Sequence, residues 1–189
     1  MRGHRPAPAT ARNTAIVALF RTSGIRVGEL TRIQLEDWDR DADTIILHET
    51  KNGSPHLVYL HPDAVPYLER WLTHRGDAPG ALFCSILGTR TRDMTPQGIR
   101  YIMRTRAAIA GIKPFGCHDF RRTFATELLR TNDIALVGKL LNHRKPQSTM
   151  RYDLADEDAA RAAVGQLELP SPSPTEGRPG GGDSRVTAA

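Results

Sequence analysis

The segment from residue 43 to 61 most constrains what this 189-residue chain can fold into. Two short runs, DTIILHE (43–49) and HLVYLH (56–61), are rich in β-branched and aliphatic residues, and TKNGSP separates them. Asn-Gly between two such runs is typical of a β-hairpin, because both residues adopt the positive φ angles that tight hairpin turns need. The sequence therefore predicts two antiparallel strands with Lys51 at the hairpin tip.

Helical periodicity dominates the rest of the chain, because apolar residues recur there three and four positions apart. Helices are expected over about residues 11–22, 26–33, 63–75, 95–111, 117–131, 132–142 and 156–169. Gly24, Thr95 and Asp133 are of the residue types that commonly end or begin helices. The sequence therefore predicts an α+β fold that is mainly α-helical, with a small antiparallel β-sheet.

The charge of the chain permits an anionic partner without requiring one. The formal net charge is +5, and acidic residues gather at 36–43 and 153–158, which leaves the remaining surface more basic. No apolar run approaches the ~20 residues that a membrane span needs, and AIVALF, closed by Arg21, is too short for a signal peptide. Cys84 and Cys117 are isolated and are interpreted as reduced, buried thiols, so the expected compartment is the cytoplasm.

Composition divides the chain into three parts. Residues 1–10 are expected to form a flexible lead, residues 11–168 one folded domain, and residues 169–189 a disordered tail. The tail contains PSPSPTEGRPGGGDSRVTAA, which has too little apolar content to pack. Its charges cancel, so the net positive charge belongs to the folded part.

Several short patterns fail as metal or nucleotide sites. DRDAD (39–43) begins like a calcium loop, but Thr44 stands where that loop requires glycine, so the segment is interpreted as an acidic turn before a strand. His56 and His61 flank a strand without metal-site spacing. GRPGGG has neither a preceding strand nor a following Lys-Ser/Thr, so it is not a phosphate-binding loop. No metal and no cofactor are expected.

Four separated segments carry the residues best suited to phosphate chemistry. His118 and Arg121 are three apart in HDFRR, so on a helix they share a face. An arginine fork can hold both non-bridging oxygens of a phosphodiester, and Arg26, near a helix start, is a second candidate for the same charge. Each of these residues alone is more often an ordinary surface or capping group. Their order and spacing together favour a phosphate-binding site.

That order resembles the tyrosine recombinases, the phage integrase family. The segments TSGIRVGEL, the Lys51 hairpin, HDFRRTFATELL and LLNHRKPQSTMRYDL follow the family order of Arg, Lys, His-x-x-Arg, His and Tyr. The resemblance covers about residues 11–168 and implies the catalytic-domain fold of DNA breaking-rejoining enzymes. It also implies a site-specific recombinase that works through a covalent 3′-phosphotyrosine, with neither metal nor ATP.

The resemblance assigns a role to each candidate residue. Arg26 and Arg121 would clamp the scissile phosphate, and Lys51 would be the general acid. His118 would assist proton transfer, His143 would contact the phosphate, and Tyr152 would be the nucleophile. The implied partners are double-stranded DNA and three further copies of the chain, joined into a homotetramer by exchange of the C-terminal helix. Exposed basic residues could follow the DNA backbone or form an ordinary solvated face, namely Arg100, Arg104 and Arg106.

The chain departs from the family pattern in three places. Asn142 stands where glycine usually precedes the second histidine, a mild change because asparagine tolerates left-handed backbone geometry. Arg122 replaces a histidine found in many members. Only about ten residues precede the catalytic block, so the N-terminal DNA-clamping domain of the family is expected to be absent. A DNA-binding remnant without effective strand transfer is the alternative function, and a type IB topoisomerase is a third possibility.

Overall fold

The protein is described from a computed structural model, which covers residues 7–48, 54–87, 90–142 and 161–168. The helices are α1 Pro8–Ser23, α2 Val27–Leu30, α3 Val65–Arg75, α4 Pro96–Ile109, α5 Cys117–Leu128 and α6 Ile134–Leu140, with a 3-10 turn η1 at Leu35–Asp37. The strands are β1 Trp38–Asp39, β2 Thr44–Leu47, β3 His56–Tyr59, β4 Cys84–Leu87 and β5 Arg90–Asp93. Among these helices, none combines the length and apolar content that a bilayer crossing requires.

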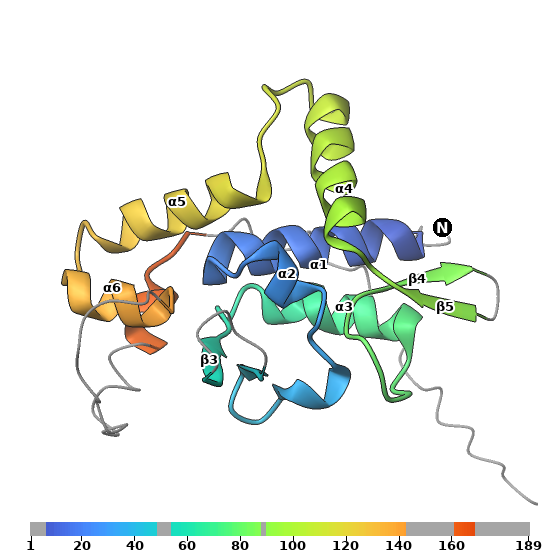
Figure 1. Ribbon diagram of the computed structural model, residues 1–189, viewed down its shortest axis with the longest axis horizontal. Helices are drawn as coiled ribbons and strands as arrows, with labels where there is room; N and C mark the ends of the chain where they lie inside the picture. The colour runs from blue at the N-terminus through green and yellow to red at the C-terminus, as the bar shows by residue number, and fades with distance from the viewer. Residues whose placement is uncertain (1–6, 49–53, 88–89, 143–160, 169–189) are drawn as a thin grey trace, which may run out of the picture.

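Helix α1 runs through the centre of the fold. Figure 1 shows α3 beside it, α4 rising from it, and α5 with α6 at the end opposite the β4–β5 hairpin. Ile16, Leu19 and Phe20 of α1 are completely buried, and Trp71 of α3 packs in the same apolar core. The helix that was expected from residue 11 thus begins at Pro8, so residues 8–10 are helical as well.

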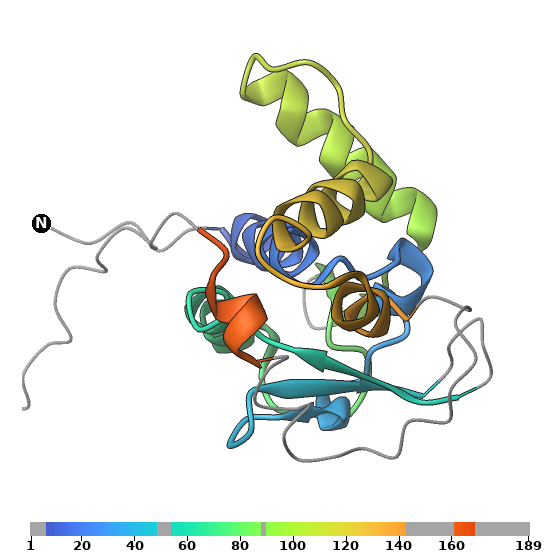
Figure 2. The same cartoon turned by 90° about the vertical axis from the view of Figure 1, so that its left-hand side faces the viewer.

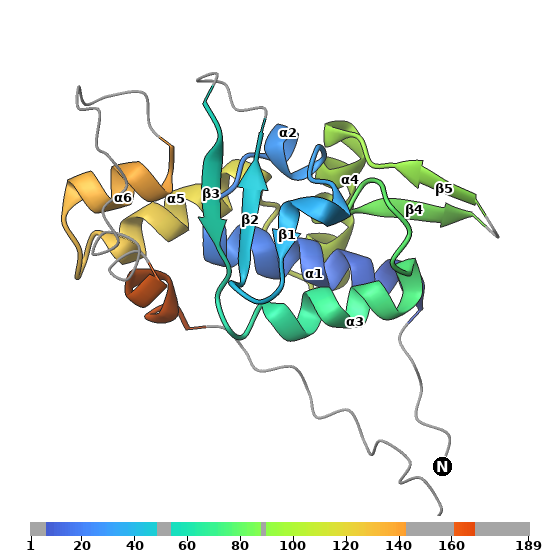
Figure 3. The same ribbon diagram turned by 90° about the horizontal axis from the view of Figure 1, so that it is seen from below.

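The predicted hairpin is present and is extended by one more strand. Strands β2 and β3 are antiparallel, with Thr44 opposite Tyr59, and β1 pairs with the outer edge of β2. The three strands lie side by side in Figure 3, and Figure 2 shows them below α1, α5 and α6. Ile45 and Val58 turn into the main core. The acidic turn at 40–43 joins β1 to β2, as expected, and its Asp39 carboxylate accepts the N–H groups of the turn.

A second apolar cluster lies beyond β3. It is made by Tyr59 of β3, by α5 and α6, and by the segment 161–168, of which residues 161–165 are helical. Phe124 and Leu128 of α5 are almost completely buried in it, and the C-terminal segment contributes Ala163, Val164 and Leu167. Phe124 and Leu128 thus face this cluster, and Phe120 of the same helix packs against the main core.

The predicted helix caps are confirmed. Gly24 is left-handed, with φ 60°, and its N–H donates to Phe20 O. The Thr95 hydroxyl accepts the Gly98 N–H at 3.1 Å, and the Asp133 carboxylate accepts the Leu136 N–H at 2.8 Å. The second helix is shorter than expected, because α2 has only four residues and Arg26 is its N-cap. The tail and the first six residues lie outside the described residues.

Candidate functional site

Two arginines converge where α2, α5 and the end of α6 meet. Arg26 precedes the first turn of α2, and Arg121 lies in the second turn of α5. The Arg121 side chain is buried, with 7% of its surface exposed, whereas Arg26 remains about one-third exposed. A buried guanidinium costs free energy unless its N–H groups find acceptors, so the contacts of Arg121 define this site.

Arg121 ties two distant segments together. Its Nη1 donates to the carbonyl of Gly24 at 2.7 Å, and its Nη2 donates to the carbonyl of Leu141. Burial, and to a smaller extent the neighbouring charge of Arg26, lower the pKa of Arg121 to about 10, while Glu29 opposes both. A pKa of about 10 keeps the group cationic at neutral pH.

Glu29 is the counter-ion of the arginine pair. Its Oε1 accepts from Arg26 Nη1 at 2.8 Å, and its Oε2 accepts the Arg26 backbone N–H at 2.9 Å. Only 5% of the Glu29 side chain is exposed. One carboxylate therefore fixes both the backbone and the side chain of Arg26 at the start of α2.

The carbonyl groups at the end of α6 accept hydrogen bonds from side chains of three elements. Leu140 O receives His56 Nε2 at 3.1 Å, Leu141 O receives Arg121, and Asn142 O receives Arg26 Nη2 at 3.4 Å. Asn142 itself has φ 50°, so the chain turns there in the left-handed conformation. Asparagine tolerates this conformation, as the sequence predicted for position 142.

Gly24 admits the close approach of these elements. Its φ of +60° disfavours any side chain, and a Cβ there would lie 2.8 Å from Phe124 Cδ1 and 3.0 Å from Leu141 Cδ2. A glycine that ends α1 thereby lets α5 and α6 pack against the loop leading to Arg26. The sequence marked Gly24 as a helix cap, and its second role depends on tertiary contacts.

The predicted site residues fall into three groups. Arg26 and Arg121 are brought together. His118 is one turn before Arg121 on α5 and is exposed. Lys51, His143 and Tyr152 lie outside the described residues, although Lys51 belongs to the connection between β2 and β3, and His143 directly follows Asn142.

The basic residues of α4 do not share one environment. Arg100 and Arg104 are exposed, whereas Arg106 is partly buried and its Nη2 lies 3.5 Å from Thr10 Oγ1 of α1. Only the first two therefore remain candidates for contact with an anionic partner. Arg122, next to Arg121 on α5, is exposed as well.

His56 is the residue of this site that the sequence reasoning missed. It opens β3, directly after the segment that contains Lys51, and its ring reaches the end of α6. Burial lowers its pKa, and Arg121 and Arg26 act in the same direction, against the raising effects of the Leu140 carbonyl and Glu29. Only its position beside the predicted hairpin tip could have indicated this role from the sequence. Metal-site spacing, by which it was judged, does not bear on such a contact.

The two cysteines take no part in this geometry. Cys84 and Cys117 are free and buried, as expected, and burial raises the pKa of both thiols. Within residues 7–48, 54–87, 90–142 and 161–168, no three His, Cys, Asp or Glu side chains gather in a way that could hold a metal ion. The two guanidinium groups at the described site are suited to an anion with two oxygens.

Comparison with known protein families agrees with that chemistry. The model of the phage integrase family matches residues 2–158. Tyrosine recombinase XerC of Lactobacillus delbrueckii subsp. bulgaricus is 31% identical over 157 residues, covering 77% of this chain and 51% of the relative. Tyrosine recombinase XerD of Mycobacterium tuberculosis is 31% identical over 170 residues, covering 84% and 53%. The chain thus spans about half the length of the curated relatives that it matches.

A solved structure shows the same architecture. The crystal structure of XerA recombinase superposes with a TM-score of 0.65 at 26% identity, covering 85% of this chain and 53% of the other. The predicted fold class, a mainly helical catalytic domain with small antiparallel sheets, is confirmed.

Proposed function

This chain belongs to the phage integrase family, and from that membership we propose that it is the catalytic part of a site-specific DNA recombinase. Residues 11–168 are the proposed catalytic domain, and double-stranded DNA is the proposed substrate. The relatives reported above are named recombinases, which favours strand transfer over a topoisomerase or a remnant that only binds DNA.

The proposed reaction is a transesterification. The phenolic oxygen of Tyr152 attacks the scissile phosphorus and gives up its proton with the help of His118. The bond to the 5′ oxygen breaks, and Lys51 supplies the proton that turns the leaving oxygen into a 5′-hydroxyl. The product is a 3′-phosphotyrosine ester, which a 5′-hydroxyl of the partner strand attacks to restore a phosphodiester. Because the ester bond conserves the free energy, the cycle requires no ATP.

The observation that carries this proposal is the convergence of Arg26 and Arg121 at the end of α6. Each terminal nitrogen of a guanidinium bears two N–H groups, and the two carbonyl contacts of Arg121 use one on each. The remaining N–H groups can bind the non-bridging oxygens of a phosphodiester. Two fixed positive charges there would stabilise the charge that develops in the five-coordinate transition state.

The histidines are proposed to complete the site. His118 lies on the same helix as Arg121, one turn earlier, and would assist proton transfer. His143 comes directly after the residue whose carbonyl Arg26 contacts, and would donate to the phosphate. Arg100 and Arg104, exposed on α4, are proposed to contact the DNA backbone.

The C-terminal segment is proposed to link subunits in a homotetramer on DNA. In the single chain, Val164 and Leu167 of this segment pack into the second apolar cluster. The same apolar residues could pack into that cluster on a neighbouring copy. Cross-linking and mass photometry of the DNA-bound protein would test this assembly.

A trapped covalent adduct tests the function directly. The full chain is mixed with nicked DNA duplexes from which the 5′-hydroxyl fragment escapes, and the products are separated on a denaturing gel. We expect an adduct that is lost in Tyr152→Phe and falls at least about a hundredfold in Arg121→Ala, since removing a preorganised transition-state donor costs about that much.

Matched controls separate chemistry from folding. Tyr101→Phe changes an exposed tyrosine of α4, and Arg130→Ala an exposed arginine beyond α5. Both should form the adduct at the unmodified rate. An adduct that persists in Tyr152→Phe would remove Tyr152 as the nucleophile, and specific DNA binding with no adduct on any substrate would favour the binding remnant.

A further inference from the structure

The end of α6 is held by polar side chains that come from three separate elements. Leu140, Leu141 and Asn142 offer consecutive carbonyls, and the donors are His56 from β3, Arg121 from α5 and Arg26 from the start of α2. The last carbonyls of a helix have no partner within it, and donors are favoured there by the helix dipole. This end of α6 therefore depends on its three donors.

The donors are not equivalent. Arg121 and Arg26 are proposed phosphate ligands, so their N–H groups must serve both the backbone carbonyls and the bound DNA. His56 contacts Leu140 O at 3.1 Å. A carbonyl oxygen only accepts, so Nε2 must carry the proton in this contact.

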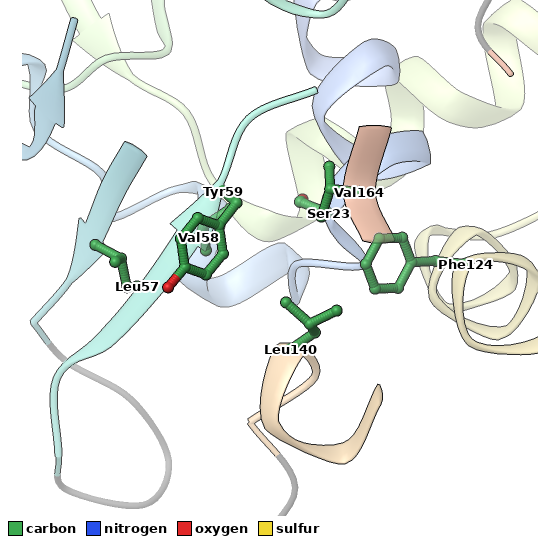
Figure 4. Close-up of a pocket in the computed structure, with 7 residues that line it drawn as sticks. All are labelled: Ser23, Leu57, Val58, Tyr59, Phe124, Leu140 and Val164. Carbon is green, nitrogen blue, oxygen red and sulfur yellow. The ribbon is translucent and has the colours of Figure 1, made fainter. Parts of the chain in front are cut away.

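A small space lies beside this end of α6. A small pocket remains where β3 faces α5 and α6, lined by Ser23, Leu57, Val58, Tyr59, Phe124, Leu140 and Val164. Figure 4 shows the β3 side chains on one side of it, and Phe124 and Leu140 on the other. Apolar contacts have no preferred direction, whereas the hydrogen bond from His56 to Leu140 O has one and can set the register of β3 against α6.

We propose that His56 is a positioning residue for strand cleavage: its Nε2–H fixes the last turn of α6 against β3. This inference rests on the proposed function, and it goes beyond the residues that the family resemblance assigns. Through this contact one side chain links the strand that follows Lys51 to the helix end that precedes His143. The geometry of the proposed acid and of the arginine clamp thus depends on a residue that need not touch DNA.

Two amide substitutions separate the hydrogen bond from the imidazole ring. In His56→Gln, the side-chain NH₂ falls where Nε2 was and can donate to Leu140 O. In His56→Asn, the NH₂ falls near the Nδ1 position and cannot reach it. The pair therefore differs in the one contact under test, and His56→Met, of similar size without a donor, replaces His56→Asn if that variant does not fold.

Hydrogen exchange provides a measurement that does not depend on catalysis. We expect His56→Asn to raise amide exchange in a peptide covering residues 134–142 about tenfold, since an opened hydrogen bond lowers local protection, and to leave a peptide covering 11–22 in α1 unchanged. His56→Gln should match the unmodified chain in both peptides. Equal exchange in all three proteins would overturn the proposal.

The adduct assay then connects position to reaction. We expect His56→Asn to slow adduct formation about tenfold at unchanged DNA affinity, and His56→Gln to restore most of the rate. Equal loss in both variants would contradict the hydrogen-bond role, and loss of DNA affinity alone would assign His56 to binding. If the unmodified chain forms no adduct while the exchange difference is present, the positioning contact stands and the proposed function fails.

Discussion

Glu29 is the only carboxylate that contacts Arg26 in the described part of the chain, and it is nearly inaccessible to solvent. Removing one member of a buried ion pair leaves the other charge uncompensated, and here two guanidiniums lie close together. Because Arg26 is about one-third exposed, solvent screens part of that cost.

Glu29→Gln is therefore expected to lower the free energy of unfolding by about 1–3 kcal/mol. Urea denaturation at neutral pH measures it. Glu69→Gln serves as the control, because Glu69 is half exposed and lies 4.0 Å from Arg40, so its loss should change stability by less than about 0.5 kcal/mol. Equal effects of the two substitutions would mean that the buried carboxylate does not balance the arginine pair.

His56 gives the stability a dependence on pH. Burial lowers its pKa, helped by Arg121 and Arg26 and opposed by the Leu140 carbonyl and Glu29, so the unfolded chain takes up a proton at a higher pH than the folded chain. As the pH falls below about 6.5, the unfolded state gains protons first and the free energy of unfolding decreases. The decrease continues until the pH passes the folded pKa of His56.

Urea denaturation at pH 7.5 and pH 5.5 tests this linkage. The unmodified chain should lose more stability between the two pH values than His56→Gln, which keeps a donor but does not titrate. Identical losses would show that His56 titrates alike in the folded and unfolded chains.

Some of these residues could be predicted from the sequence and others could not, for a physical reason. Arg26 and Arg121 were found because their types and spacing match a phosphate-binding pattern. His56 was set aside because its local pattern resembles any strand-flanking histidine, and its contact with Leu140 joins positions 84 residues apart. Contacts of that kind depend on tertiary structure, which a local pattern does not contain.

At the scale of elements, the junction at Gly24 is the most constrained connection. Gly24→Ala would place a side chain at φ +60°, and its Cβ would lie 2.8 Å from Phe124 Cδ1. Left-handed strain costs about 1–2 kcal/mol and overpacking about 1–3 kcal/mol, so we expect a loss of roughly 2–5 kcal/mol. Thermal or urea denaturation measures the change.

Gly111→Ala is the matched control for Gly24→Ala. Gly111 has nearly the same φ, +65°, but a Cβ there would meet nothing within 4 Å. It should therefore show the strain alone, and the difference between the two variants isolates the clash with α5 and α6. No difference would mean that these helices shift aside at little cost.

The elements themselves were largely predictable, with instructive exceptions. Helices α1, α3, α4, α5 and α6 follow apolar periodicity and the caps Gly24, Thr95 and Asp133. Strand β5, with the sequence RTRD, has no apolar alternation and forms because it pairs with β4. The second helix was expected to run to residue 33, but it ends at Leu30, and Ile33 O instead accepts the Leu82 N–H. Hydrogen bonds to residues outside the segment therefore determine both the formation of β5 and the end of α2.

At the scale of the whole molecule, two apolar clusters of unequal size meet at the candidate site. The main core surrounds α1, and the second cluster joins α5, α6, Tyr59 and residues 163–167. Arg121 spans the boundary, with one N–H on Gly24 at the end of α1 and another on Leu141 after α6. The relative position of Arg26 and Arg121 therefore depends on the second cluster. Among the described residues, the C-terminal segment supplies no hydrogen-bond donor to the site itself.

Val164→Asp should loosen this cluster from a distance. A carboxylate in place of a side chain that is 2% exposed must either lose its hydration or leave the cluster, so α6 should lose protection against hydrogen exchange while α1 keeps it. Ala162→Asp adds the same charge at an exposed position two residues away and should leave both helices unchanged. If α1 and α6 lose protection together in Val164→Asp, the two clusters unfold as one unit, and Arg121 then lies inside a single cooperative core rather than at a seam.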